Sequence, residues 1–165
     1  MCAITRVPKF HWFGYYDKCE FDPTNRYVLS NEVDFEHRTP AAGDVINVGM
    51  VDLQDNDKWI ELGQSNAWGW QQGCMLRWLP GSEDREIIYN DRRGGQFVAV
   101  VREVESGRER VLPRPVYALT PDGRGAVTVN FTRLHHFYAG YGYAGGPQDG
   151  QIENPAPDDE GLWWM

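Results

Sequence analysis

Short apolar and β-branched runs alternate with turns rich in Pro, Gly, Asn and Asp along most of the chain. Three segments share one pattern, in which a strand end, a turn and a short β-rich strand ending in Ser or Asn follow one another. They are residues 21–30, 78–90 and 119–130. Runs of this kind, bounded by turn residues, predict antiparallel strands. No long stretch places apolar residues at helical spacing, so the pattern predicts an all-β chain.

A second kind of hairpin lies between these segments, at residues 48–62 and 97–112. Each of the first segments, together with the hairpin that follows it, therefore forms a unit of four antiparallel strands. These units repeat with a period near that of propeller blades. We expect a single domain over 1–165, an incomplete β-propeller of about two and a half blades. The blades are expected at about 15–63, 70–113 and, in part, 116–165, as the N-terminal fragment of a longer protein. A sandwich of short strands is the structural alternative.

Composition narrows the class of partner. The chain carries 24 acidic and 16 basic residues, a formal charge of −8, which argues against binding nucleic acid through phosphates. It has no apolar run near the roughly 18 residues of a membrane span and no signal-peptide core, so we expect a cytoplasmic protein without a membrane partner. Its three cysteines form no Cys-x-x-Cys pair, which favours free thiols in a reducing compartment.

The connections between the predicted strands differ in length on the two faces of the expected propeller. Strands alternate in direction, so successive turns fall on opposite faces. One face receives short turns, at residues 22–25, 54–57, 80–83, 105–107 and 121–123. The other, the long-loop face, receives residues 11–18, 31–44, 66–73, 90–96 and 130–143. These longer segments mix aromatic side chains with Arg, Asn, Gln and His, which is typical of binding loops.

The long-loop face supplies the candidate ligand-binding residues. Trp68 and Trp70 either pack between blades or stack on a ligand, and Asp17 and Lys18 either pair with each other or line a pocket. The stretch 90–95 is either a polar turn or a clamp in which Arg guanidinium groups bind a carboxylate. The full set is Asp17, Trp68, Trp70, Gln71, Gln72, Asn90, Asp91, Arg92, Arg93 and Tyr141.

The candidates for catalysis are Lys18, Arg133 and His135. His135 and His136 are adjacent, and on an extended segment they would point to opposite sides, so they would not share one metal ion. The sequence contains no nucleophile elbow, phosphate loop or zinc pattern that would define an enzyme class. No metal ligand is assigned.

Three runs carry a resemblance to a known group of proteins. Residues 13–18 (Phe-Gly-Tyr-Tyr-Asp-Lys), 70–75 (Trp-Gln-Gln-Gly-Cys-Met) and 88–92 (Ile-Tyr-Asn-Asp-Arg) resemble bacterial propellers related to oligogalacturonate lyases and to TolB-like, WD40-like propellers. The resemblance covers nearly the whole chain at the level of blades. Oligogalacturonate lyases are seven-bladed and cleave short uronate oligomers by β-elimination with a divalent metal, typically manganese. No residue here matches a metal ligand of that family, whose metal-binding segments lie mostly in later blades.

The resemblance also implies roles for individual residues. Arg92, Arg93 and Arg133 would face uronate carboxylates or the enolate-like transition state. Lys18 or His135 would transfer a proton, and Tyr141, Trp68 and Trp70 would stack on sugar rings. We therefore expect a carbohydrate-active propeller that binds an acidic oligosaccharide or another small polar ligand, and that cleaves it if it is a polysaccharide lyase. The alternative is a non-catalytic scaffold or sensor that binds a protein or peptide.

Overall fold

The first 65 residues build a four-stranded antiparallel sheet in the order β1-β2-β3-β4. Its strands are β1 (Phe10–Trp12), β2 (Tyr27–Val33), β3 (Ile46–Asp52) and β4 (Lys58–Ser65). The computed structural model describes residues 1–165 throughout. Each strand follows a turn of Pro, Asn, Asp or Gly, and each pairs with its neighbour in sequence, which is the simplest way to satisfy the backbone groups of short strands.

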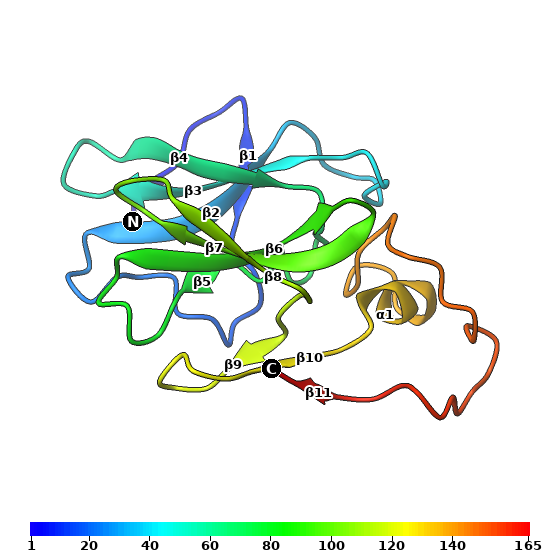
Figure 1. Ribbon diagram of the computed structural model, residues 1–165. Coiled ribbons are helices and arrows are strands. Elements are labelled where there is room, and N and C mark those ends of the chain that lie inside the picture. Colours follow the sequence, from blue (N-terminus) through cyan, green and yellow to red (C-terminus); the bar gives the residue numbers. More distant parts are fainter.

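Two further sheets follow in the same manner (Figure 1). The second has the order β5-β6-β7-β8 and contains β5 (Arg77–Trp78), β6 (Glu86–Arg93), β7 (Gln96–Glu103) and β8 (Glu109–Leu112). The third contains β9 (Ala118–Leu119), β10 (Ala126–Thr128) and β11 (Trp163–Trp164), with β10 in the middle. The helix α1 (Phe131–Phe137) lies in the long connection between β10 and β11. With seven residues it is far from the length and apolarity that a membrane crossing requires.

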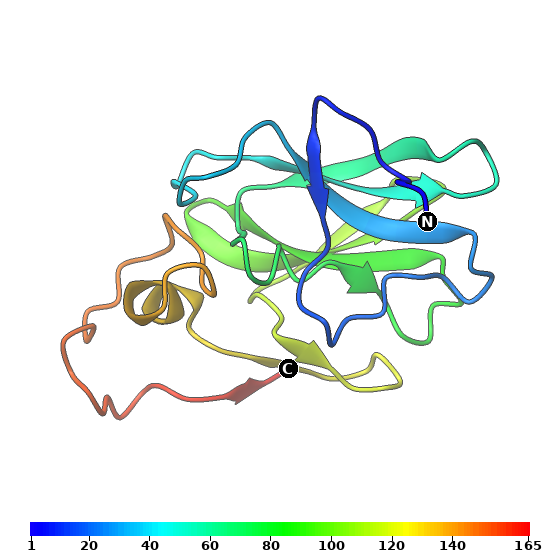
Figure 2. The same cartoon turned by 180° about the vertical axis from the view of Figure 1, so that it is seen from behind.

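Alternation of side chains across the second sheet explains why the sheets stack. Ile87, Tyr89 and Val100 join the core shared with the first sheet. Their neighbours Ile88 and Val101 join the core shared with the third sheet. Because successive residues of a strand point to opposite faces, an apolar run buries both faces and needs a partner on each side. Figures 1 and 2 show the three sheets as successive layers, and the prediction of an all-β chain is confirmed.

The first strand of the first sheet is interrupted. Trp12 pairs with Asn31 and Phe21 with Val28 on the same edge of β2. Trp12 and Phe21 are nine positions apart in the sequence, whereas their partners Asn31 and Val28 are only three positions apart on β2. The chain between Trp12 and Phe21 therefore has six residues more than a continuous strand would need, and these leave the sheet. Figure 2 shows this excursion descending from β1 past the edge of the second sheet before the chain returns to β2. We call residues 13–19 the first-strand excursion.

Two expectations about local structure, one for residues 90–96 and one for His135 and His136, are wrong. Residues 90–96 are not a loop, because β6 continues to Arg93 and a two-residue turn leads into β7. Gly94 and Gly95 supply the positive φ angles, 58° and 79°, that such a tight hairpin requires. His135 and His136 lie not on an extended segment but in α1, which Asn130 caps by accepting a hydrogen bond from the Arg133 amide at 3.0 Å.

His11 and Glu32, which the sequence places in long loops, are strand residues as well. His11 lies in β1 and Glu32 in β2, directly opposite each other. Polar side chains in a short strand resemble those of a loop in sequence, and only pairing with a neighbouring strand distinguishes the two.

Asn90 connects the second sheet to the segment that leads into the third. Its side chain is fully buried. The amide nitrogen donates to the Val116 carbonyl at 2.8 Å and to the Tyr143 hydroxyl at 2.9 Å, while the amide oxygen accepts from the Val116 N–H at 2.7 Å. A buried amide with three partners satisfies nearly all its polar atoms and fixes the path of the backbone it binds.

Replacement of Asn90 by alanine is expected to lower the free energy of unfolding by about 3 kcal/mol, because the buried Val116 amide and carbonyl lose their partners. The measurement is urea unfolding followed by circular dichroism. Gln71→Ala removes an exposed amide and should change stability by no more than about 0.5 kcal/mol. Equal unfolding midpoints for the two variants would contradict this role of Asn90.

Candidate functional site

Three segments that are distant in sequence meet beside the edge of the second sheet. They are the first-strand excursion 13–19, the connection 69–73 and the segment 138–143 that follows α1. A Cβ atom at Gly14 would lie 2.7 Å from the Gln72 carbonyl oxygen, and one at Gly69 would lie 2.5 Å from that of Gly140. The backbone N–H of Gln71 also donates to the Gly140 carbonyl at 3.2 Å. Glycine is therefore needed where these backbones touch, and we call the three segments together the loop junction.

Four of the five tyrosines in the loop junction form one aromatic group, and the fifth, Tyr143, is fully buried. The ring centroids of Tyr15 and Tyr16 are 4.3 Å apart, those of Tyr15 and Tyr141 are 6.4 Å apart, and those of Tyr138 and Tyr141 are 5.3 Å apart. Tyr16 and Tyr138 are largely exposed. The interaction with the Tyr141 hydroxyl raises the pKa of Tyr15. The group offers aromatic faces and hydroxyls that both donate and accept hydrogen bonds.

Of the residues that the sequence singles out, the loop junction brings together Asp17, Lys18, Gln71, Gln72 and Tyr141. The Lys18 ammonium lies 2.7 Å from an Asp17 carboxylate oxygen, and the Lys18 side chain is only 4% exposed. Gln72 is buried and donates to the Tyr117 hydroxyl at 3.2 Å, whereas Gln71 is exposed. Lys18 is the single Lys or Arg in these three segments and Asp17 the single Asp or Glu, so the junction is locally neutral.

Glu20 is a functional candidate that the sequence did not reveal. It follows the excursion, is 6% exposed, and neither carboxylate oxygen has a hydrogen-bond partner. Burial raises its pKa to about 8, and the positive charges of Lys18 and Arg77 offset only part of that effect. A carboxyl group that is neutral near physiological pH beside an ammonium is a common arrangement for proton transfer.

The side chains of Trp68 and Trp70 pack against other aromatic rings of the protein, although Trp70 belongs to segment 69–73 of the loop junction. Their rings lie 5.1 Å apart at right angles, and both contact Trp12 and Phe35. The Trp68 indole nitrogen donates to the Asp44 carbonyl at 3.0 Å and that of Trp70 to the Arg38 carbonyl at 2.6 Å. Both side chains therefore attach the β2–β3 loop to the connection after β4.

The polar residues of β6 are also engaged in internal contacts. Arg92 donates to the carbonyls of Gly145 and Ala42, at 2.6 and 2.5 Å, and thereby links two loops. Arg93 lies 3.1 Å from Asp91 and 2.9 Å from Glu109. These guanidinium groups have protein acceptors, which leaves them less free to bind a ligand carboxylate.

Arg133 and His135 lie on α1. Arg133 forms an ion pair with Asp149 at 3.1 Å and donates to the backbone carbonyls of Gln151 and Asn154, so it holds the loop after α1. The Nδ1 atom of His135 is buried without a hydrogen-bond partner. No group of three or more His, Cys, Asp and Glu side chains is arranged to hold a metal ion, so these residues do not fit the manganese that the resemblance implies.

The raised pKa of Glu20 has a consequence for stability. The folded state holds this proton up to about pH 8, whereas the unfolded chain releases it near its ordinary pKa of 4.5. Stability is therefore expected to fall as pH rises between these values, by about 5 kcal/mol in total. Glu20→Gln should remove this slope and be more stable than the wild type at pH values above about 8.

Urea unfolding of both proteins across this pH range measures the difference. The exposed Glu105→Gln serves as the matched control and should retain the wild-type slope. Parallel pH profiles for the wild type and Glu20→Gln would show that Glu20 is ionised in the folded protein.

Comparison of the chain with models of protein families, with characterised proteins and with solved structures finds no match. The description of the fold therefore rests on the sheets themselves, which are antiparallel and stacked. The comparisons do not test the resemblance to oligogalacturonate lyases, which rests on the three short runs alone.

Proposed function

We propose that the protein is a β-propeller-type carbohydrate-binding protein whose loop junction binds a short acidic oligosaccharide. The observation that carries this proposal is the convergence of four tyrosines, one ammonium and one exposed amide from three separate segments. Aromatic faces suit the C–H faces of sugar rings, and hydroxyl and amide groups suit their hydroxyls. The ammonium supplies a partner for a uronate carboxylate.

The sheet arrangement supports the propeller part of the proposal. Two successive four-stranded sheets have the same order, with each strand beside its neighbour in sequence. The third sheet repeats the beginning of this order with β9, β10 and β11. Blades of a propeller pack face to face through apolar side chains, as these sheets do.

Local electrostatics at the loop junction favour a short ligand over a long polyanion. The formal charge of −8 repels a polyanion at long range, so attraction depends on Lys18. Asp17, whose side chain is 56% exposed, is its present partner. Because the Asp17 side chain already reaches water, it can turn to the solvent and leave its place at Lys18 to a ligand carboxylate.

Cleavage by β-elimination is the more specific part of the proposal. A base removes the proton beside the uronate carboxylate, the glycosidic C–O bond breaks, and the leaving oxygen takes up a proton. The products are a shortened sugar with a new hydroxyl and an unsaturated sugar that absorbs ultraviolet light. Lys18 is the candidate for proton transfer at the loop junction, with Glu20 beside it. A rise in ultraviolet absorbance on mixing with oligogalacturonate tests this step separately from binding.

One observation favours the alternative of a non-catalytic scaffold. Phe137, Leu162 and Trp164 are 59%, 75% and 69% exposed. Exposed large apolar side chains often mark protein contacts. A scaffold would bind a protein through these side chains and show neither uronate binding nor a change in absorbance.

Lys18→Met is expected to weaken trigalacturonate binding about 10- to 100-fold, because a charge-assisted hydrogen bond is lost while the apolar stem is kept. Asp17→Asn should strengthen binding roughly threefold, because it removes the competing carboxylate. Isothermal titration calorimetry at low salt measures both effects.

Arg124→Met provides the matched control, since it removes an exposed positive charge from the turn between β9 and β10. Its affinity should equal that of the wild type. If Lys18→Met also binds like the wild type, the loop junction is not the uronate site.

A further inference from the structure

A row of four polar side chains crosses the first sheet from edge to edge. His11, Glu32, Asn47 and Gln64 occupy directly paired positions on β1, β2, β3 and β4. The Gln64 amide donates to the Asn47 side-chain oxygen at 3.0 Å, and the Asn47 amide donates to Glu32 at 2.7 Å. The other Glu32 oxygen lies 3.0 Å from Nε2 of His11. Each strand thus supplies one member of a continuous polar chain.

This row fixes the orientation of the His11 imidazole. The side chains of His11 and Glu32 are 8% and 10% exposed, so the carboxylate has little access to water as an alternative partner. A buried carboxylate requires N–H donors, and we assign the proton of the neutral imidazole to Nε2 for this reason. Nδ1 then carries the lone pair, and no group of the protein donates to it. The arrangement is that of a base held by a carboxylate.

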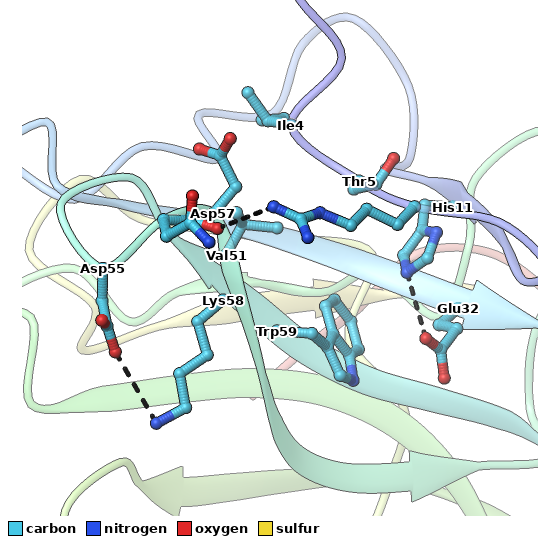
Figure 3. A pocket seen from close by; sticks show the side chains of 11 residues that line it. Ile4, Thr5, His11, Glu32, Val51, Asp55, Asp57, Lys58 and Trp59 are labelled. Atoms are coloured by element: carbon cyan, nitrogen blue, oxygen red, sulfur yellow. Dashed lines mark hydrogen bonds and ion pairs between the residues drawn. The ribbon is translucent and has the colours of Figure 1, made fainter.

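His11 lies in the wall of a pocket of about 560 Å³ on the face of the first sheet turned away from the second (Figure 3). The N-terminal residues 4–6 and the β3–β4 turn form the other walls. Trp59 also lines the pocket, with its ring in an edge-on contact with His11 at 5.2 Å. A Cβ atom at Gly49 would lie 2.4 Å from the Trp59 ring, so the glycine allows the indole to rest on the backbone of β3. The volume is typical of a small-molecule site.

The polar groups of the pocket are mixed in kind. Arg6 and Lys58 lie among three carboxylates, those of Asp55, Asp57 and Glu32, and the Glu32 carboxylate is bound by His11 and Asn47. The Arg6 guanidinium has only the Asn56 carbonyl, at 3.3 Å, as a partner, and the indole nitrogen of Trp59 is buried without one. Donors and acceptors thus face the same space, and the one negative charge in excess, that of Glu32, disfavours an anion. A ligand with several neutral hydroxyls satisfies both kinds of group.

We propose that this pocket is a second binding site, distinct from the loop junction, for a neutral polyhydroxylated small molecule such as a single sugar unit. A ligand hydroxyl donates to Nδ1 of His11, and a face of the sugar ring packs against Trp59. Glu32, Asn47 and Gln64 act as positioning residues for His11.

The test uses two-dimensional NMR of the indole N–H groups of the seven tryptophans. The Trp59 signal is assigned by its loss in Trp59→Phe. The probes are the methyl glycosides of glucose, galactose and mannose together with myo-inositol, compared with galacturonate and inorganic phosphate. A neutral probe at millimolar concentration is expected to shift the Trp59 signal and leave that of Trp68 unchanged. No shift with any neutral probe, or tighter binding of either anion, would overturn the proposal.

The affinity of variants for a neutral probe tests which residues form the site. His11→Ala is expected to weaken binding at least tenfold, and Arg6→Ala, in the N-terminal segment, several-fold. Wild-type affinity in both variants would overturn the proposal. Gln64→Leu tests the positioning row and should weaken binding a few-fold, with Gln96→Leu as the matched exposed control. Nitrogen-15 shifts of His11 at alkaline pH should report a proton on Nε2 in the wild type and a mixture of tautomers in Glu32→Gln.

The two sites can fail separately. Lys18→Met should leave the response of Trp59 to neutral probes unchanged, and His11→Ala should leave trigalacturonate binding unchanged. Loss of both activities in either variant would show a shared structural effect and overturn the assignment of two sites.

Discussion

Burial of both faces of the second sheet is the constraint on which the rest of the structure depends. Residues of β6 and β7 alternate between two apolar cores, one shared with the first sheet and one with the third. Such a sheet is stable only when it is covered on both sides, because apolar area is the main stabilising term. The first and third sheets are not sandwiched in this way. Polar rows and interrupted strands therefore occur in the first sheet, where one face is free of this requirement.

Polar groups between the sheets are tolerated in two different ways. Asn90 is fully buried, and its hydrogen bonds to Val116 and Tyr143 replace those it would make with water. Glu20 has no such partners, and it is accommodated by retaining its proton, as its pKa of about 8 indicates. The first solution fixes a structure, whereas the second leaves a group that can exchange a proton. Glu20 is for this reason a better functional candidate than Asn90, although only Asn90 stood out in the sequence.

The parts of the fold that were predictable are those specified by local turn chemistry. The Pro-, Asn- and Asp-rich turns before β2 and β10 and the apolar runs of β3 and β7 indicated strands correctly. The extension of β6 through Arg93 was missed, because Asp91 and Arg93 look like loop residues until their partners Asn66 and Glu109 are in place. The Gly94–Gly95 pair was a local hairpin signal that outweighed them. At the site, the sequence could not show that Arg92 and Arg133 are bound within the protein. Their acceptors are backbone carbonyls that only the tertiary fold brings close.

One irregularity links the two proposed sites. The six extra residues between Trp12 and Phe21 carry Tyr15, Asp17 and Lys18 to the loop junction. The same excursion shifts the register of the first strand by six residues, so that His11 comes opposite Glu32. An uninterrupted strand from Phe21 would place Asp17 opposite Glu32 and leave Glu32 without a histidine. An insertion in an edge strand disturbs only one row of hydrogen bonds, so it can add polar chemistry on both sides of a sheet while the apolar stack remains intact.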